Sequence, residues 1–506
     1  MPHKTILSSI PSDILQRRFT LASEPALFRR MHIKENGEGV ASESILRRLC
    51  DEKDPLASFV KTLVLGPTDE EVLAVKLADA WRCMSSLETI VWETYQPIAS
   101  SILKQLGAAP HIKLDLIYGT LRPDHVRMDK TALSSRSLHT LTFTVFAEQL
   151  IPHTRSEFSA LKECLIEGEN PRDLTLHIRR MSQPSSDYTA GTLNLQLEKG
   201  DIFPALERLV LDCHDIYELS AEHCQIWTHT MDWGRLRELD LGHGAPQHLL
   251  FALTGKVVAL KRLRFGFWRN YGRVRVTWND PKDLNVVRLF LESIDALEDV
   301  TLFTGDDSAM KRVRPTLLCK HGASLKRLIV WLGMRESWSV KDVSALRQYA
   351  PCLQELDVPV DMYQERKHST LWVLATGLRE GLAQVKGLER LQPDYTRAYE
   401  RSRWPTKAQK ILCSFRELRS LTLRIQLKYD SYQFVPDARP GLRSAINDEF
   451  ARKTAMALFD DFAPGSKIEV VRIIFKAREP GVVVDRVVKG EEYEEQTWNE
   501  PFDPFA

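Results

Sequence analysis

The sequence predicts an α/β solenoid, in which short parallel strands follow one another across one sheet and helices run along its other side. Three observations predict it. One short apolar pattern recurs along nearly the whole chain, segments with helical periodicity lie between its copies, and the composition is that of an ordinary globular protein. The chain has 506 residues, of which 43% are hydrophobic and 27% are charged, so it is neither wholly disordered nor fibrous.

The recurring pattern is an apolar residue, two polar residues, and then two apolar residues separated by one other. Side chains two apart on a strand share a face, so Leu239 and Leu241 are expected to point into one core while Glu238 and Asp240 face water. In a second copy, Leu356 should be buried while Glu355 and Asp357 should be exposed. The middle positions of the twelve clear copies are Leu63, Ile90, Leu141, Cys164, Leu209, Leu239, Leu263, Val300, Leu328, Leu356, Leu421 and Val471.

Helical segments lie between the copies. In 283–294, 340–350 and 371–385, apolar residues recur at the three- and four-residue spacing of one buried helix face. Asp283, which follows Pro281 closely, is a candidate cap for the first of these helices. Each repeat is therefore predicted to run from a helix through a short turn into a strand.

This pattern resembles the leucine-rich repeat, L-x-x-L-x-L. The resemblance implies a horseshoe with parallel strands on the concave side and helices on the convex side. The Asn or Cys that this family carries three residues after the last strand leucine is mostly replaced, for example by His214 and Gly244, so its asparagine ladder is missing here. The spacing of the copies is irregular, and the long gaps are expected to hold insertions or longer helices.

A solenoid needs closed ends, because a terminal repeat would otherwise expose its core. At the C-terminus, two strand-like runs flank a Glu-Pro-Gly turn, which predicts a capping hairpin over 466–490. An acidic tail is expected over 491–506. The leucine-rich repeat solenoid is then expected to occupy 41–465.

The first 40 residues carry a different motif. Pro11, Ile14, Leu15 and Phe19 are similar to the opening of an F-box, and 17–33 is similar to the closing half found in fungal F-box proteins with leucine-rich repeats. The match is shorter than the family's F-box, so 1–40 is expected to form a degenerate F-box-like cap. The alternative is that this segment is only a helical cap for the solenoid.

The resemblance to fungal F-box/leucine-rich repeat proteins covers nearly the whole chain. It implies a substrate receptor of an SCF-type cullin–RING ubiquitin ligase, which would act in the cytoplasm or nucleus and would catalyse no reaction itself. The cap would bind the adaptor, and through it the cullin scaffold, with Pro11, Ile14, Leu15 and Phe19. The alternative is an F-box-deficient leucine-rich repeat scaffold with no link to a ubiquitin ligase.

The concave strands would bind the protein substrate. Residues that flank the inward leucines point to the concave side, because successive side chains alternate. Parallel strands lie about 4.8 Å apart, so these side chains should form one stripe. Arginines beside aromatic residues are typical of interface hot spots, unless the long insertions cover them. The substrate-binding residues expected on this basis are Arg208, Arg262, Arg264, Trp268, Phe303, Arg327 and Trp331.

Other classes of site have little support. Lys and Arg total 69 against 68 Asp and Glu, and this net charge of +1 argues against a nucleic-acid partner. The chain has 8 Cys but no C-x-x-C pair, which is typical of reduced intracellular thiols. Apolar runs are too short to predict a membrane span. The aromatic and arginine residues of 267–280 are compatible with an extra hairpin.

The densest cluster of potential metal ligands is Cys213, His214, His223 and Cys224. Its spacing matches no usual zinc site, so these residues are expected to serve as turn and core residues. The sequence contains none of the common nucleophile, phosphate-binding or metalloprotease motifs. We therefore expect no catalytic residue, metal or cofactor.

Overall fold

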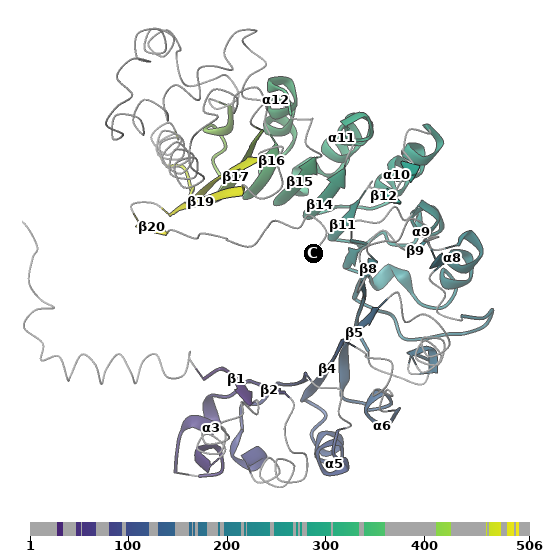
Figure 1. The fold of residues 1–506 in the computed structure, drawn as a ribbon, viewed down its shortest axis with the longest axis vertical. Coiled ribbons are helices and arrows are strands. Elements are labelled where there is room, and N and C mark those ends of the chain that lie inside the picture. The colour runs from purple at the N-terminus through teal and green to yellow at the C-terminus, as the bar shows by residue number, and fades with distance from the viewer. Residues whose placement is uncertain are drawn as a thin grey trace, which may run out of the picture. The chain divides into compact units, whose positions relative to one another are not determined.

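The protein is represented by a computed structural model, and Figure 1 shows its fold. It divides into two compact units, unit 1 (Met1–Ser185, Thr192–Cys213 and Leu219–Leu236) and unit 2 (Ser186–Gly191, His214–Glu218 and Arg237–Ala506). The structure describes residues 28–33, 47–51, 53–66, 80–93, 98–120, 130–146, 161–163, 165–166, 171–179, 191–192, 197–213, 217–218, 220–242, 247–266, 270–271, 274–275, 281–304, 307–332, 338–359, 411–426, 462, 465–476, 483–489 and 492–494.

Unit 1 contains parallel strands that pair in chain order, with helices between them. The strands are β1 (Arg30–Ile33), β2 (Thr62–Leu65), β3 (Thr89–Trp92), β4 (Lys113–Thr120), β5 (Leu138–Phe146), β6 (Asp173–Arg179) and β8 (Arg208–Cys213). The helices are α3 (Leu56–Phe59), α5 (Ser100–Ala108), α6 (Lys130–Leu133), α8 (Ala221–Trp227) and the 3-10 turn η3 (Trp233–Arg235). A two-residue strand, β7 (Gly191–Thr192), spans the boundary with unit 2.

Unit 2 continues the same scheme and ends in antiparallel strands. Its parallel strands are β10 (Glu238–Asp240), β11 (Arg262–Gly266), β14 (Asp299–Thr304), β15 (Arg327–Leu332), β16 (Glu355–Pro359), β17 (Ser420–Gln426) and β18 (Val470–Lys476). The antiparallel strands that follow are β19 (Val483–Lys489) and β20 (Glu492–Glu494). Short strands lie outside the main sheet, namely β9 (Tyr217–Glu218), β12 (Asn270–Tyr271) and β13 (Val274–Arg275).

Helices connect the strands of unit 2. They are α9 (Gln247–Leu253), α10 (Pro281–Glu292), α11 (Asp307–His321), the 3-10 turn η4 (Gly322–Ser324) and α12 (Val340–Tyr349). In Figure 1, α9 to α12 lie along one side of the strands of unit 2, and no helix that the structure describes lies on the other side of these strands. The expected α/β architecture, an open parallel sheet with intervening helices, is thus confirmed and is compatible with a solenoid.

The core of each unit is a ladder of apolar side chains at predicted strand positions. The predicted copy around Cys164 is an exception and is wrong, because 161–163 and 165–166 are helical. In unit 2, Leu239 pairs in register with Leu263, and the ladder continues through Val300 and Leu328 to Leu356. All five side chains are buried, which confirms the prediction for Leu239 and Leu356. Unit 1 has the same kind of ladder in two stretches, because the register shifts between β4 and β5. The stretches are Leu63, Ile90, Leu114 and Leu138, and then Leu116, Leu141, Leu174 and Leu209, all of them buried.

One prediction about the alternate positions is wrong. Asp357 is only 7% exposed, whereas the strand pattern predicts that it faces water. Its register partners are Ile329 on β15 and Thr422 on β17. Because neighbouring strands lie about 4.8 Å apart, side chains on the open face of a sheet cover one another. Glu355, Glu238 and Asp240, which were also predicted to face water, are partly covered in the same way.

Backbone hydrogen bonds connect each repeat to the next at the point where the strands begin. The Lys261 carbonyl accepts hydrogen bonds from the backbone N–H groups of Glu298 (2.8 Å) and Asp299 (3.1 Å) in the next repeat. The carbonyl of Glu298 accepts two backbone hydrogen bonds from the following repeat in the same way. In unit 1, the carbonyl of Lys61 also accepts two such bonds from the next repeat. The start of each strand is therefore tied to the previous repeat through backbone groups, which need no particular side chain.

The helix starts follow local chemistry. Ser339 and Asp342 form a capping box at the start of α12, as each side chain bonds the other residue's backbone N–H. The candidate cap Asp283 is not the start of α10, because the helix already begins at Pro281. Proline suits the first helical position, since its fixed φ is helical and its missing N–H is not needed there. The predicted helix 371–385 lies outside the described residues.

Candidate functional site

In the strands of unit 2, the side chains that alternate with the buried leucines point to the other side of the sheet. We call this surface of β10, β11, β14, β15 and β16 the unit-2 face. Its residues come from strand positions adjacent to the buried leucines, and pairing in register aligns them in rows. The unit-2 face consists of Glu238, Asp240, Arg262, Arg264, Asp299, Thr301, Phe303, Arg327, Ile329, Trp331, Glu355 and Asp357.

The first row of the unit-2 face alternates in charge from strand to strand. Arg262 Nη1 donates a hydrogen bond to Glu238 at 3.2 Å. Arg327 lies between two carboxylates, with Nη1 3.2 Å from Asp299 and Nε 2.9 Å from Glu355. Burial opposes the charged form of Arg327, but these carboxylates outweigh it and raise the pKa of its guanidinium. The row is therefore held together by ion pairs between strands.

Aromatic side chains lie at the far end of β14 and β15. The Arg264 guanidinium lies 4.9 Å from the ring centre of Phe303, within the range of a cation–π interaction. The Phe303 and Trp331 ring centres are 5.7 Å apart. Phe303 is only 6% exposed, whereas Trp331 is partly exposed. Phe303 therefore supports its neighbours, and Trp331 offers the accessible ring.

The structure brings most of the predicted substrate-binding residues together. Arg262, Arg264, Phe303, Arg327 and Trp331 share the unit-2 face. The other two predicted residues are Arg208 and Trp268. Arg208 belongs to unit 1, where its Nη1 lies 3.3 Å from Thr175 Oγ1, and Trp268 lies outside the described residues. The F-box-like residues Pro11, Ile14, Leu15 and Phe19 also lie outside them.

Unit 1 carries a second polar surface that the sequence analysis missed. Its residues alternate with the buried leucines of β4, β5, β6 and β8, and we call this surface the unit-1 face. The residues are common strand-face types, so only the pairing of the strands reveals that they meet. The unit-1 face consists of Asp115, His139, Thr140, Asp173, Thr175, His177, Arg208 and Asp212.

Carboxylates and imidazoles are the main ionisable groups of the unit-1 face. The strand register shifts beside Asp115, which leaves His139 as an extra residue with its Nδ1 3.9 Å from the Asp115 carboxylate. His177 Nδ1 lies 3.1 Å from Asp212 Oδ2. Burial raises the pKa of Asp115, and it raises the pKa of Asp173 as well. Protonation at mildly acidic pH is thus easier here than at an exposed carboxylate.

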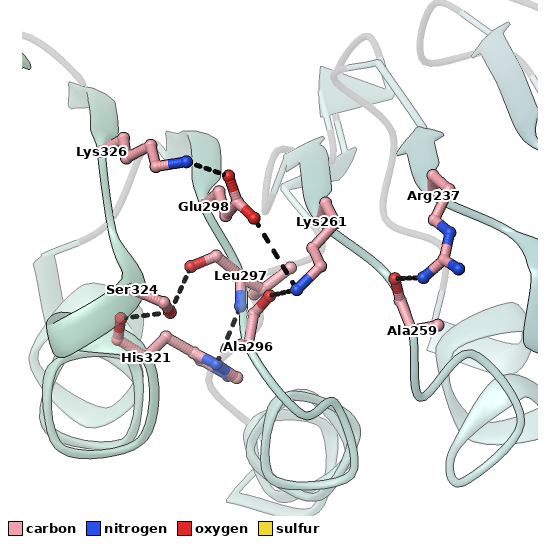
Figure 2. A network of polar contacts seen from close by, with 9 residues as sticks. All are labelled: Arg237, Ala259, Lys261, Ala296, Leu297, Glu298, His321, Ser324 and Lys326. Carbon is pink, nitrogen blue, oxygen red and sulfur yellow. Dashed lines mark hydrogen bonds and ion pairs between the residues drawn. The ribbon is translucent and has the colours of Figure 1, made fainter.

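Figure 2 shows a third polar cluster, which lies where the strands of unit 2 begin. Glu298 lies between two lysines, 2.6 Å from Lys326 Nζ and 3.7 Å from Lys261 Nζ. The hydrogen bond from Lys326 is the main reason that the pKa of Glu298 is lowered. This N-terminal edge of the sheet is basic, because Lys261 and Lys326 share one carboxylate.

A buried histidine anchors the turn that leads into β14. His321 Nδ1 accepts a hydrogen bond from the Leu297 N–H at 3.3 Å, and its Nε2–H donates to the Leu291 carbonyl at 3.0 Å. The ring is therefore neutral, with its proton on Nε2. Burial lowers the pKa of His321 to about 4. This arrangement is structural, since both partners are backbone groups.

The cysteine and histidine cluster is structural where it is described. His223 and Cys224 lie buried on α8, and burial lowers the pKa of His223 and raises that of Cys224 to about 12. A thiol with so high a pKa stays protonated and is a poor metal ligand. Across the described ranges, no group of three or more His, Cys, Asp or Glu side chains could hold a metal ion.

Comparison with known proteins does not identify the family of this chain. No protein-family model matches the chain, and no curated protein matches it. Among the helices that the structure describes, none has the length and apolar composition needed to cross a membrane. The functional argument therefore depends on the two sheet faces.

Proposed function

We propose that the chain is a leucine-rich repeat horseshoe that binds a protein ligand on its concave strands and catalyses no reaction. The observation that carries the proposal is the unit-2 face, where arginine, carboxylate and aromatic side chains lie together on a sheet surface that none of the described helices covers. The buried ladder behind them fixes the direction of each side chain. A rigid surface of this composition loses little conformational entropy on binding.

We further propose that the chain is a substrate receptor of an SCF-type ubiquitin ligase. This part rests on the similarity of 10–33 to an F-box, whose residues Pro11, Ile14, Leu15 and Phe19 would contact the adaptor and, through it, the cullin scaffold. The unit-2 face would then hold the substrate, in the cytoplasm or the nucleus. Without the adaptor contact, the same surface would serve a scaffold with no ubiquitin-ligase link.

The binding face is tested by affinity purification with the triple variant Arg264→Glu, Arg327→Glu and Trp331→Ala. We expect the variant to lose specific protein partners while circular dichroism shows an intact fold. The matched control is Arg288→Glu, Arg312→Glu and Phe251→Ala, which changes exposed residues of the same kinds on α9, α10 and α11. A folded face variant that keeps every partner would place the binding surface elsewhere.

The ubiquitin-ligase link is tested separately by deleting residues 1–27, which removes Pro11, Ile14, Leu15 and Phe19 but keeps β1, whose Met31 and Ile33 are buried. The full chain should co-purify with the adaptor and the cullin, and the truncated chain should lose both while its repeats stay folded. If the full chain fails to bind the purified adaptor directly, the scaffold alternative is correct. The two experiments are independent, since one changes the unit-2 face and the other leaves it intact.

A further inference from the structure

A row of mostly apolar positions crosses the unit-2 face and continues onto β17 and β18. Each position lies three residues beyond the buried ladder position of its strand, and pairing in register aligns the positions across the sheet. We call this row the third row. It consists of Gly266, Phe303, Trp331, Pro359, Arg424 and Ile474.

The third row differs in chemistry from the first row, which is held by ion pairs. On the described strands β11 to β18, the only charged position of the third row is Arg424, and Asp485 lies opposite Ile474 where the row ends on β19. The Phe303 and Trp331 rings lie side by side on it, and Trp331 is partly exposed. The third row therefore suits a segment that brings aromatic side chains, because aromatic pairs stabilise such contacts.

The last described strand directs the chain toward this row. β20 pairs with β19 and β19 with β18, which places Glu494 in register with Val487 and Arg472. Arg472 lies two residues before Ile474 of the third row. Both pairings are antiparallel, so β20 runs in the same direction as the parallel strands. The chain therefore leaves Glu494 toward the level of the third row.

Residues 495–506 are long enough to follow the third row. β20, β19, β18, β17, β16 and β15 are consecutive in the sheet, so five strand spacings, or about 24 Å, separate β20 from β15. The eight residues from 495 to Phe502 span up to about 26 Å when extended. Phe502 can therefore reach Trp331 on β15, and Phe505 can reach Phe303 on β14.

The composition of 495–506 favours a docked segment. Three of its twelve residues, Trp498, Phe502 and Phe505, are aromatic, against 8% of the whole chain. Segments that stay solvated usually contain few aromatic residues. Pro501 and Pro504 lack the N–H that pairing beside β20 would need. Contact with the rings of the third row would remove the aromatic side chains from water without extending the sheet.

We infer that residues 495–506 dock on the third row of the same chain, with Phe502 against Trp331. The consequence for the ligand rests on the proposed function, because Trp331 belongs to the proposed binding face. A docked segment covers part of this face, so a ligand has to displace it. The segment thus acts as an internal competitor of the ligand.

The test uses a fluorescently labelled peptide with the sequence of 495–506 and two forms of the full chain. One is the wild type, and the other is the segment variant Trp498→Ala, Phe502→Ala and Phe505→Ala. We expect the segment variant to bind the peptide, because its own segment no longer occupies the third row. The wild type should bind it at least about tenfold more weakly, since an attached competitor acts at an effective concentration on the order of 1 mM. Equal binding by both forms, or no binding by the segment variant, would overturn the inference.

A second change locates the peptide on the face. Added to the segment variant, Trp331→Ala should weaken peptide binding about fivefold, the effect of losing one aromatic pair. The matched control is Phe251→Ala, which removes an aromatic ring that is 60% exposed on α9. Equal effects of the two changes would place the peptide elsewhere and overturn the inference.

Sedimentation velocity distinguishes docking within one chain from docking on a second copy. The wild type should sediment at a rate that does not change with protein concentration. Self-association that disappears in the segment variant would show docking between copies and overturn the inference. The proposed function would fail separately, through unchanged partner capture by the triple face variant.

Discussion

The unit-1 face carries aspartates, histidines and threonines, whereas the unit-2 face carries arginines, carboxylates and aromatic rings. Both stand on the same kind of parallel strand, and each lies opposite a ladder of buried leucines in its own unit. The repeat therefore decides where a side chain points, and the residues between the leucines decide what the surface can bind. Chemically different surfaces can thus be built on one backbone pattern at little cost to the core.

The two regions also differ in the direction in which the pKa values of their carboxylates are shifted. On the unit-1 face, burial raises the pKa of Asp115 and Asp173. In unit 2, burial also acts on Asp342, but hydrogen bonds from Ser339 and the charge of Arg314 prevail and lower its pKa. Burial therefore outweighs the partners of Asp115 and Asp173 and favours their protonation in mild acid, whereas Ser339 and Arg314 keep Asp342 ionised.

The largest effect should be similar in the two units, because each has a core of the same kind. Leu141→Ala in unit 1 and Leu239→Ala in unit 2 should each lower the free energy of unfolding by about 2–5 kcal/mol. Both side chains are fully buried, and each change leaves a cavity in the leucine ladder. Urea unfolding followed by circular dichroism measures the two losses. A loss below about 1 kcal/mol in only one unit would show that its ladder is not a packed core.

The next effect concerns His321. This histidine is fully buried, whereas the histidines of the unit-1 face are half-buried. Its folded pKa of about 4 lies below the usual 6.5, so its contribution is complete above pH 6.5 and is lost as pH falls toward 4. The loss should be on the order of 3 kcal/mol.

The measurement compares the unfolding free energy of the wild type with that of His321→Asn across this pH range. The variant should start less stable at neutral pH, because the bonds to Leu291 and Leu297 are altered. The difference between the two proteins should then shrink as the pH falls. A constant difference would mean that the pKa of His321 is the same in the folded and unfolded states.

Two carboxylate changes should act in opposite directions. Asp342→Asn should destabilise unit 2 by about 1–3 kcal/mol, because it weakens the cap of α12 and removes the ionic partner of the buried Arg314. Asp115→Asn should stabilise unit 1 at neutral pH, because the buried carboxylate there is disfavoured in its charged form. Thermal unfolding at neutral pH shows whether each change raises or lowers stability. Destabilisation by Asp115→Asn would contradict the expected contrast between the carboxylates of the two units.

The smallest effect should come from the ion pairs of the unit-2 face. Glu238→Gln removes the partner of Arg262, whose side chain is 65% exposed, and should cost less than about 1 kcal/mol. The cost should diminish at high salt, since screening weakens exposed pairs. Urea unfolding at low and high salt checks this, and a large loss independent of salt would mean that the row is part of the structural framework.

The sequence predicted the strands and the buried leucines well, because both follow from local periodicity. Leu239 and Leu356 are buried as the alternation predicts, and the helix 340–350 begins at its serine cap. The alternation also placed Arg262 and Arg327 opposite the leucines. Periodicity is a property of neighbouring residues, so it can be read without knowing which strands pair.

Only the tertiary structure decided what each exposed position touches. His177 and Asp212 are 35 residues apart, and they meet because β6 pairs with β8 in one register. The burial of Asp357 likewise depends on its neighbours on β15 and β17. The sequence by itself determined the repeating core and the direction of its side chains, whereas strand pairing determined burial, ion pairs and pKa values. The reason is physical, since solvation and electrostatics depend on distances between residues that are remote along the chain.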